Sequence, residues 1–390
     1  MTSLANAQNQ QDMMNAFPPS PEAAALGKYG EIESNLYEGK ANISVPIYEY
    51  SIKGFTLPIS LDYTTSAIRV DQIATNVGLG WTLNAGGVIT QTVNGLYDVF
   101  NDRDLIPDPP NTFNPTFNSS NTQPYDDAKD IVAGLIDMES DNFTYSYPGG
   151  SGKFIISNDG NNIYPIPYSA IKINSTSEII DENGTIFNYN EAASVYYEDD
   201  CEGGGGSGSR TGNLASRLPF TGYSKFLTKI TTADGNIINL EYESFEHEYE
   251  TIIDQKYYGT GAQYGCPTEV SLDRVCYRNN AANEKRLSKI SSPQSDIEVH
   301  FNYMDDREDL IDPDNQNKPK QLDEIVILVN TDTLKVFQLT HGYFYSSGYS
   351  SSNPTTEKAL ETRLKLVSIN EVGLPGWNFE YNESIEMPRR

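Results

Sequence analysis

The sequence predicts an all-β protein, in which many short antiparallel strands and stacked hairpins form one large curved sheet, with one short helix near residues 126–138. Three observations lead to this class. Residues 57–95 alternate apolar and polar positions and are interrupted by glycines. The second half repeats a strand–turn–strand pattern that ends in an aromatic residue. The 26 tyrosines favour strands, and the plentiful asparagine and serine favour the turns between them.

The run at residues 57–95 predicts two strands joined by a glycine-rich bend. One face of the first strand is formed by its alternate residues Leu57, Ile59, Leu61 and Tyr63. Glycines in a strand context mark bends, bulges or close backbone approach, and here they allow a large indole to lie against a tightly turned chain. The structural residues that we predict in this run are Gly78, Gly80, Trp81, Gly86 and Gly87.

Four units in the second half share one layout. They begin at residues 226–230, 286–290, 321–325 and 363–366, and each continues through a turn into a second strand that ends in an aromatic residue. A single hairpin cannot bury its apolar face, so stacking such units produces a continuous curved sheet.

The chain divides into four regions by composition. We expect a flexible leader at 1–20, an N-terminal β region at 21–200, a Gly/Ser-rich linker or loop at 201–215, and a β-hairpin region at 216–390. The sequence does not decide whether the Gly/Ser run at residues 203–209 is native or engineered. The helix at 126–138 is predicted from acidic residues in its first turn and an apolar face beyond them.

The N-terminus predicts export. Ala5 and Ala7 form the small-x-small pattern of a signal-peptidase site, so a signal trimmed near Ala7-Gln8 would make the protein secreted or surface-located. The alternative is a chance match in a polar leader. No apolar stretch is long enough for a membrane span, so we expect no membrane insertion.

The charge balance excludes one class of partner. The chain has 27 basic and 54 acidic residues, a net charge of −27. Binding to nucleic acid needs a Lys/Arg stripe, so we expect no nucleic-acid partner.

Three cysteines fit an exported protein. Cys266 and Cys276 flank a predicted loop, and we expect a disulfide between them. Cys201 would then be free or would pair between chains. No CxxC motif is present, which argues against zinc.

One acidic stretch suggests a metal. Residues 305–314 contain six acidic residues, and Asp312, Asp314 and Gln316 place oxygen ligands at alternate positions, as a calcium loop requires. The glycine and glutamate of an EF-hand loop are absent, and the alternative is a solvated acidic loop. We expect no other cofactor.

The three histidines lie apart in ordinary strand or loop contexts, so we predict no catalytic residues and no enzyme activity.

The sequence resembles the opening of RHS/YD-repeat proteins, especially the long secreted ones of Bacteroidetes and related SpvB/TcB-type toxin components. The residues that carry the resemblance are Leu57, Pro58, Ile59, Ser60, Leu61, Tyr63, the tetrapeptide Gly78 to Trp81, Leu83, Gly86, Gly87 and Ile89. The stretches at 19–30 and 43–48 are similar to that family's lead-in. The family's tyrosine-aspartate signature repeats are absent, which indicates a segment that precedes the main repeat array.

The resemblance implies a structural role. In that family the repeat sheet winds into a hollow shell around a C-terminal effector, so this segment would build or cap the shell wall, with the effector beyond Arg390. Its partners would be the rest of the repeat array, that effector and the secretion machinery, as in polymorphic toxins. The alternative is a cell-surface β-sandwich module that presents tyrosine-rich loops to a glycan or a protein.

Overall fold

The computed structural model describes residues 42–64, 70–94, 141–157, 162–201, 220–263, 266–311, 319–352, 354–383 and 386–389. Over these residues the chain is almost entirely strand, and the only helix described is α3 (Thr355–Glu361), of seven residues. The all-β prediction is therefore confirmed. The helix predicted at 126–138 lies outside the described residues.

Three strands form a small antiparallel sheet. They are β1 (Asn42–Ile52), β2 (Phe55–Thr64) and β3 (Trp81–Asn84), in the order β1-β2-β3. Leu57, Ile59 and Leu61 of the central strand are buried as the alternation predicted, whereas Tyr63 is half-buried. Ser60 and Asp62 between them are buried as well. The Ser60 hydroxyl donates to the Asp62 carboxylate at 2.9 Å, which satisfies part of this buried polar pair.

The other fifteen strands form one antiparallel sheet. Its first strands are β4 (Val88–Thr92), β5 (Asn142–Tyr147), β6 (Gly150–Ile156), β7 (Ile163–Ile166), β8 (Lys172–Ser175), β9 (Glu178–Ile180) and β10 (Ile186–Cys201). The rest are β11 (Phe220–Thr231), β12 (Ile237–Gln263), β13 (Cys266–Ser291), β14 (Ile297–Asp306), β15 (Lys320–Val329), β16 (Asp332–Tyr345), β17 (Thr362–Glu371) and β18 (Trp377–Asn378). The four predicted hairpin units correspond to β11–β12, β13–β14, β15–β16 and β17–β18.

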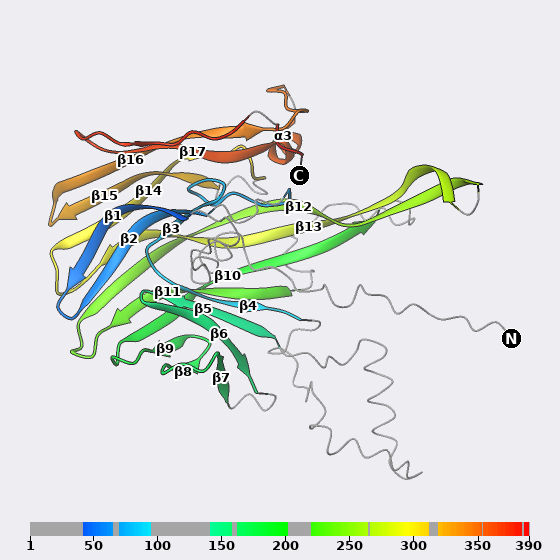
Figure 1. The fold of residues 1–390 in the computed structure, drawn as a ribbon. Coiled ribbons are helices and arrows are strands. Elements are labelled where there is room, and N and C mark those ends of the chain that lie inside the picture. The colour runs from blue at the N-terminus through cyan, green and yellow to red at the C-terminus, as the bar shows by residue number, and fades with distance from the viewer. Residues whose placement is uncertain are drawn as a thin grey trace, which may run out of the picture.

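The sheet continues across the boundary at 201–215. Strand β10 pairs with both β11 and β13, and β12 pairs with the same two strands, so these four strands form a closed circuit of pairings. The two halves of the chain therefore share one sheet. Strands β12 and β13 are 27 and 26 residues long, far longer than the short strands that the sequence suggested, and their distal parts extend beyond the other strands (Figure 1).

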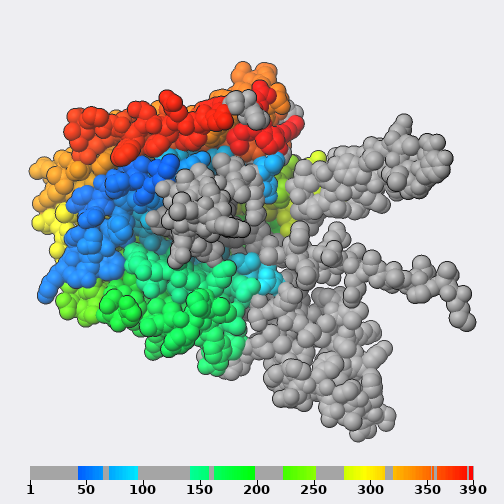
Figure 2. Space-filling view, viewed as in Figure 1, coloured from blue at the N-terminus to red at the C-terminus, as the bar shows by residue number. Residues whose placement is uncertain are grey.

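The two sheets share a large hydrophobic cluster. Figure 1 shows β1–β3 lying across the middle of the large sheet, between the β16–β17 end and the β5–β9 end, and Figure 2 shows the same order on the surface. A single buried cluster includes apolar residues from β1–β3 and from strands throughout the large sheet. The Tyr50 hydroxyl donates to the Ile297 carbonyl at 2.9 Å, which joins β1 to β14. The small sheet thus fills the curve of the large one.

Candidate functional site

The segment between β2 and β3 forms a compact turn that is built on Thr75. The Thr75 hydroxyl accepts hydrogen bonds from the amides of Val77 (3.2 Å) and Gly78 (3.3 Å), and donates to the Trp81 carbonyl at 2.7 Å. The buried Thr75 hydroxyl thus supplies hydrogen-bond partners to backbone groups that a turn would otherwise leave unpaired. The turn thereby presents residues 78–81 to the large sheet.

Gly78 lies where the turn meets strand β17. Its φ is +141°, and a Cβ there would lie 2.9 Å from the Leu366 amide nitrogen. The neighbouring Leu79 amide donates to the Leu364 carbonyl at 2.8 Å, which holds the two backbones together. Only glycine combines this φ with so close an approach.

Trp81 fills the space behind this contact. Its side chain is 1% exposed, and its indole N–H donates to the Tyr381 hydroxyl at 2.8 Å. That hydroxyl donates in turn to the Leu366 carbonyl at 2.7 Å, and burial raises the pKa of Tyr381 to about 12. The indole also packs on Phe379, with ring centroids 4.5 Å apart. A buried tryptophan normally needs such a partner for its N–H.

The other glycines of the run also lie at close contacts. Gly80 has a φ of +80°, and a Cβ there would lie 2.7 Å from the Tyr63 ring. A Cβ on Gly87 would overlap the Ser146 carbonyl oxygen, and one on Gly86 would lie 3.3 Å from Leu240. The run therefore touches β2, β5, β12 and β17, which are distant from one another in the sequence.

A buried ion pair forms hydrogen bonds with the turn. Arg307 and Asp309 pair at 2.9 Å, with side chains 1% exposed. The Arg307 guanidinium also donates to the Asn76 side chain (3.2 Å) and to the Ala74 carbonyl (2.9 Å). Asp309 accepts a further hydrogen bond from the Leu364 amide at 3.0 Å. These extra bonds satisfy charges whose removal from water would otherwise be unfavourable.

The sequence did not indicate this ion pair. Asp309 belongs to the acidic stretch that was expected to be a solvated or calcium-binding loop, and its burial contradicts the solvated interpretation at this position. The only local signal was the Arg307-Glu308-Asp309 spacing, which does not specify burial.

His341 lies beside the same turn. Its Nε2 donates to the Val77 carbonyl at 3.1 Å. Burial lowers the pKa of His341 to about 4, because the charged imidazolium is disfavoured away from water. The neutral ring is therefore a structural hydrogen-bond donor at neutral pH.

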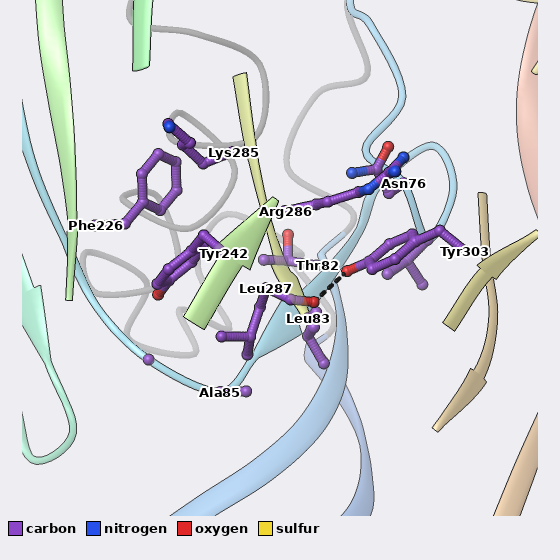
Figure 3. A pocket seen from close by; sticks show the side chains of 12 residues that line it. Asn76, Thr82, Leu83, Ala85, Phe226, Tyr242, Lys285, Arg286, Leu287 and Tyr303 are labelled. Atoms are coloured by element: carbon purple, nitrogen blue, oxygen red, sulfur yellow. Dashed lines mark hydrogen bonds between the residues drawn. The ribbon is translucent and has the colours of Figure 1, made fainter. Parts of the chain in front are cut away.

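A small cavity lies where this turn faces β11–β14 (Figure 3). Its volume is about 50 Å³, which suffices for a few water molecules but not for an organic substrate. Figure 3 shows Arg286 reaching past Tyr303 toward Asn76, and Tyr303 donating to the Leu287 carbonyl, a bond of 3.0 Å. The Arg286 guanidinium lies 4.8 Å from the Tyr303 ring and also donates to Glu243. The cavity belongs to the packing of the interior.

The described residues contain no metal-ligating cluster of three or more His, Cys, Asp or Glu side chains. Asp312, Asp314 and Gln316, the candidate calcium ligands, lie outside the described residues, as do the Gly/Ser run 203–209 and the Ala7-Gln8 position. No helix in the described part of the chain is both long and apolar enough to span a membrane.

The strand register corrects the expected disulfide. Cys266 and Cys276 lie ten positions apart on the single strand β13, a separation of about 33 Å at the rise of an extended strand. A disulfide requires Cα atoms within about 7 Å, so these two cannot be joined. Cys276 is disulfide-bonded, and β10 places Cys201 directly opposite it. Of the three cysteines in the chain, Cys201 is therefore the one within reach of Cys276.

No protein-family model and no curated protein matches the sequence. The structure is similar to a chain of the Tc holotoxin pore of Photorhabdus luminescens, at 10% identity and a TM-score of 0.35, over 85% of this chain and 15% of that one. It is also similar to the N-terminal domain of the effector protein SpvB of Salmonella typhimurium, at 10% identity and a TM-score of 0.34, over 87% of this chain and 99% of that one. The chain thus shows distant structural similarity to these toxin components and spans about 15% of the length of the Tc holotoxin chain. The similarity assigns no family.

Proposed function

We propose that this chain is a structural, non-enzymatic segment of a secreted protein, which caps one end of a β-shell that encloses an effector. The observation that carries the proposal is the placement of β1–β3 within the curve of a single fifteen-stranded sheet. The apolar face inside a curved sheet needs a second layer to cover it, and the small sheet supplies that layer.

The attachment of the small sheet supports a capping role. It is joined to β14 through Tyr50, to β17 through Leu79, and to the segment after β18 through Trp81. These attachments lie more than 200 residues away along the chain, so the small sheet holds distant parts of the wall in one arrangement. A rigid cap of this kind suits a container better than a catalyst.

The chemistry of the described residues also favours a structural role. The Asn76 side chain and the Ala74 carbonyl accept hydrogen bonds from the buried Arg307, and the cavity beside the turn is too small for a substrate. The disulfide at Cys276 fits an oxidising, extracellular environment.

A structure of the natural polypeptide that contains this segment would test the proposal. We expect residues 220–390 to form contiguous wall hairpins of a closed shell, with β1–β3 at one end. Independent sandwiches with an open aromatic face would contradict it and would favour a surface binding module.

A protease-protection assay on the same polypeptide provides a second test. We expect the effector to resist digestion in the native protein and to be digested when Trp81→Ala loosens the cap. Tyr164→Ala, on the exposed β7 strand, is the matched control and should leave protection unchanged. Equal protection in both variants would contradict the capping role.

A further inference from the structure

A cleft of about 690 Å³ separates β1–β2 from the end of the large sheet. One wall includes Tyr48 and Glu49 of β1, and the other includes Phe337 of β16, Glu371 of β17 and Trp377 of β18. Figure 2 shows these two parts of the chain, blue and red, as neighbours on the surface. The volume lies within the range of pockets that bind ligands in other proteins, about 300–1,000 Å³.

The rim of the cleft exposes an apolar surface. Val372, Leu374 and Trp377 are 59%, 58% and 56% exposed, and all three lie within six residues of one another. The turn that carries them is fixed to the sheet, because the Val372 amide donates to the Val336 carbonyl at 2.9 Å. Large apolar side chains that gather on a fixed surface beside a cleft are typical of an interaction site.

Strand β18 also presents an open backbone edge here. It is the last strand in the order of the large sheet, and in the described part of the chain it pairs with β17 alone. The Phe379 amide donates to the Val367 carbonyl at 2.9 Å, so the amides of residues 377 and 379 face β17. Alternation along the strand then directs the Asn378 amide and carbonyl away from β17. An unpaired edge of this kind can accept a further strand.

The charge of the cleft indicates the composition of the occupant. Glu49 and Glu371 line it, and Lys335, the one cation among the described lining residues, is already paired with Glu371 at 3.1 Å. The chain as a whole carries a net charge of −27. An occupant with basic residues would therefore be favoured electrostatically.

We propose that this cleft binds an extended segment of a partner polypeptide, which pairs with the outer edge of β18. Its apolar residues lie in the cleft against Trp377 and Leu374, and alternate Lys or Arg residues face the carboxylates. This binding site is independent of the capping role, because it needs only the edge of β18 and the adjacent cleft.

The probe is a ten-residue peptide of alternating valine and lysine, titrated into the intact chain by calorimetry. We expect saturable binding at one site, and protection of the Asn378 amide from hydrogen exchange when the peptide is bound. A peptide of the same composition with the valines and lysines in two blocks is the control, and should bind at least tenfold more weakly. Equal binding of the two peptides would overturn the proposal.

Two variants test the two parts of the site. Asn378→Pro removes the outward amide but leaves the bonds toward β17, and should weaken binding at least tenfold. Trp377→Ala should weaken it similarly by removing apolar contact. Tyr164→Ala removes a similarly exposed aromatic side chain from β7, at the opposite end of the sheet, and should leave the affinity unchanged. An unchanged affinity in Asn378→Pro would exclude strand addition.

Binding of a different occupant would also overturn the proposal. An oligosaccharide panel that binds at Trp377, with no binding of the alternating peptide, would identify a glycan site. A concentration-dependent dimer that Asn378→Pro abolishes, without peptide binding, would identify a second copy of the chain as the occupant.

Discussion

Replacing Gly78 with alanine should strongly destabilise the protein. A φ of +141° is unfavourable for an L-residue by about 1–3 kcal/mol. The added Cβ would also lie 2.9 Å from the Leu366 backbone nitrogen, and overpacking of this kind costs about 1–3 kcal/mol. The two effects act together, so we expect Gly78→Ala to lower the free energy of unfolding by about 4 kcal/mol, the middle of the summed range.

The assay is denaturant unfolding followed by tryptophan fluorescence. The chain has two tryptophans, so a Trp377→Phe background leaves the buried Trp81 as the only reporter, and it lies beside the substituted position. Gly373→Ala is the matched control, because Gly373 has a φ of +89° but nothing within 4 Å of a Cβ. It should lose only the backbone contribution, about 1–2 kcal/mol. If Gly78→Ala loses no more than Gly373→Ala, the close contact with β17 does not contribute to stability.

Four further results are expected. Tyr381→Phe should cost about 1–3 kcal/mol in unfolding free energy, because it leaves a buried indole N–H without an acceptor; no change in the denaturation midpoint would contradict this. Asp309→Asn should cost about 3–5 kcal/mol, because Arg307 would remain buried without its counter-charge; equal stability of the two proteins would show that the pair is dispensable. The folded-state pKa of His341 is below its ordinary value, so stability should be constant above about pH 6.5 and fall by about 3 kcal/mol toward pH 4, and His341→Gln should remove this dependence in pH-dependent unfolding. Peptide mapping without reduction should find Cys266 alkylated, and a Cys266–Cys276 peptide would refute the strand register.

Local patterns predicted much of the fold. The alternating residues Leu57, Ile59 and Leu61 are buried in β2 as expected. The four hairpin units of the second half appear as paired strands. These features depend on residues near one another in the sequence, where the period of two and the turn residues carry the information. The same holds for the importance of the glycines, since a glycine in a strand context signals close approach, although not to which partner.

The pairings between distant segments could not be predicted in this way. Nothing near Cys201 in the sequence indicates that β10 lies beside β13. The prediction of a Cys266–Cys276 disulfide was wrong because it assumed a loop where the single long strand β13 runs. The burial of Asp309 likewise depends on Leu364, more than fifty residues away. The burial of apolar surface over the whole fold brings such segments together against the entropic cost of closing the loops between them, and no local pattern records this balance.

The sequence by itself determined the β class, the hairpin succession and the glycine-rich run, because strand period and turn chemistry are local properties. Only the tertiary structure decided that residues 78–81 contact β17 and that Arg307 and Asp309 support them. It alone placed the small sheet within the curve of the large one, and it left the outer edge of β18, beside a cleft, without a partner strand in the described part of the chain. These arrangements follow from register and packing between segments up to 300 residues apart, where the free energy depends on the whole fold.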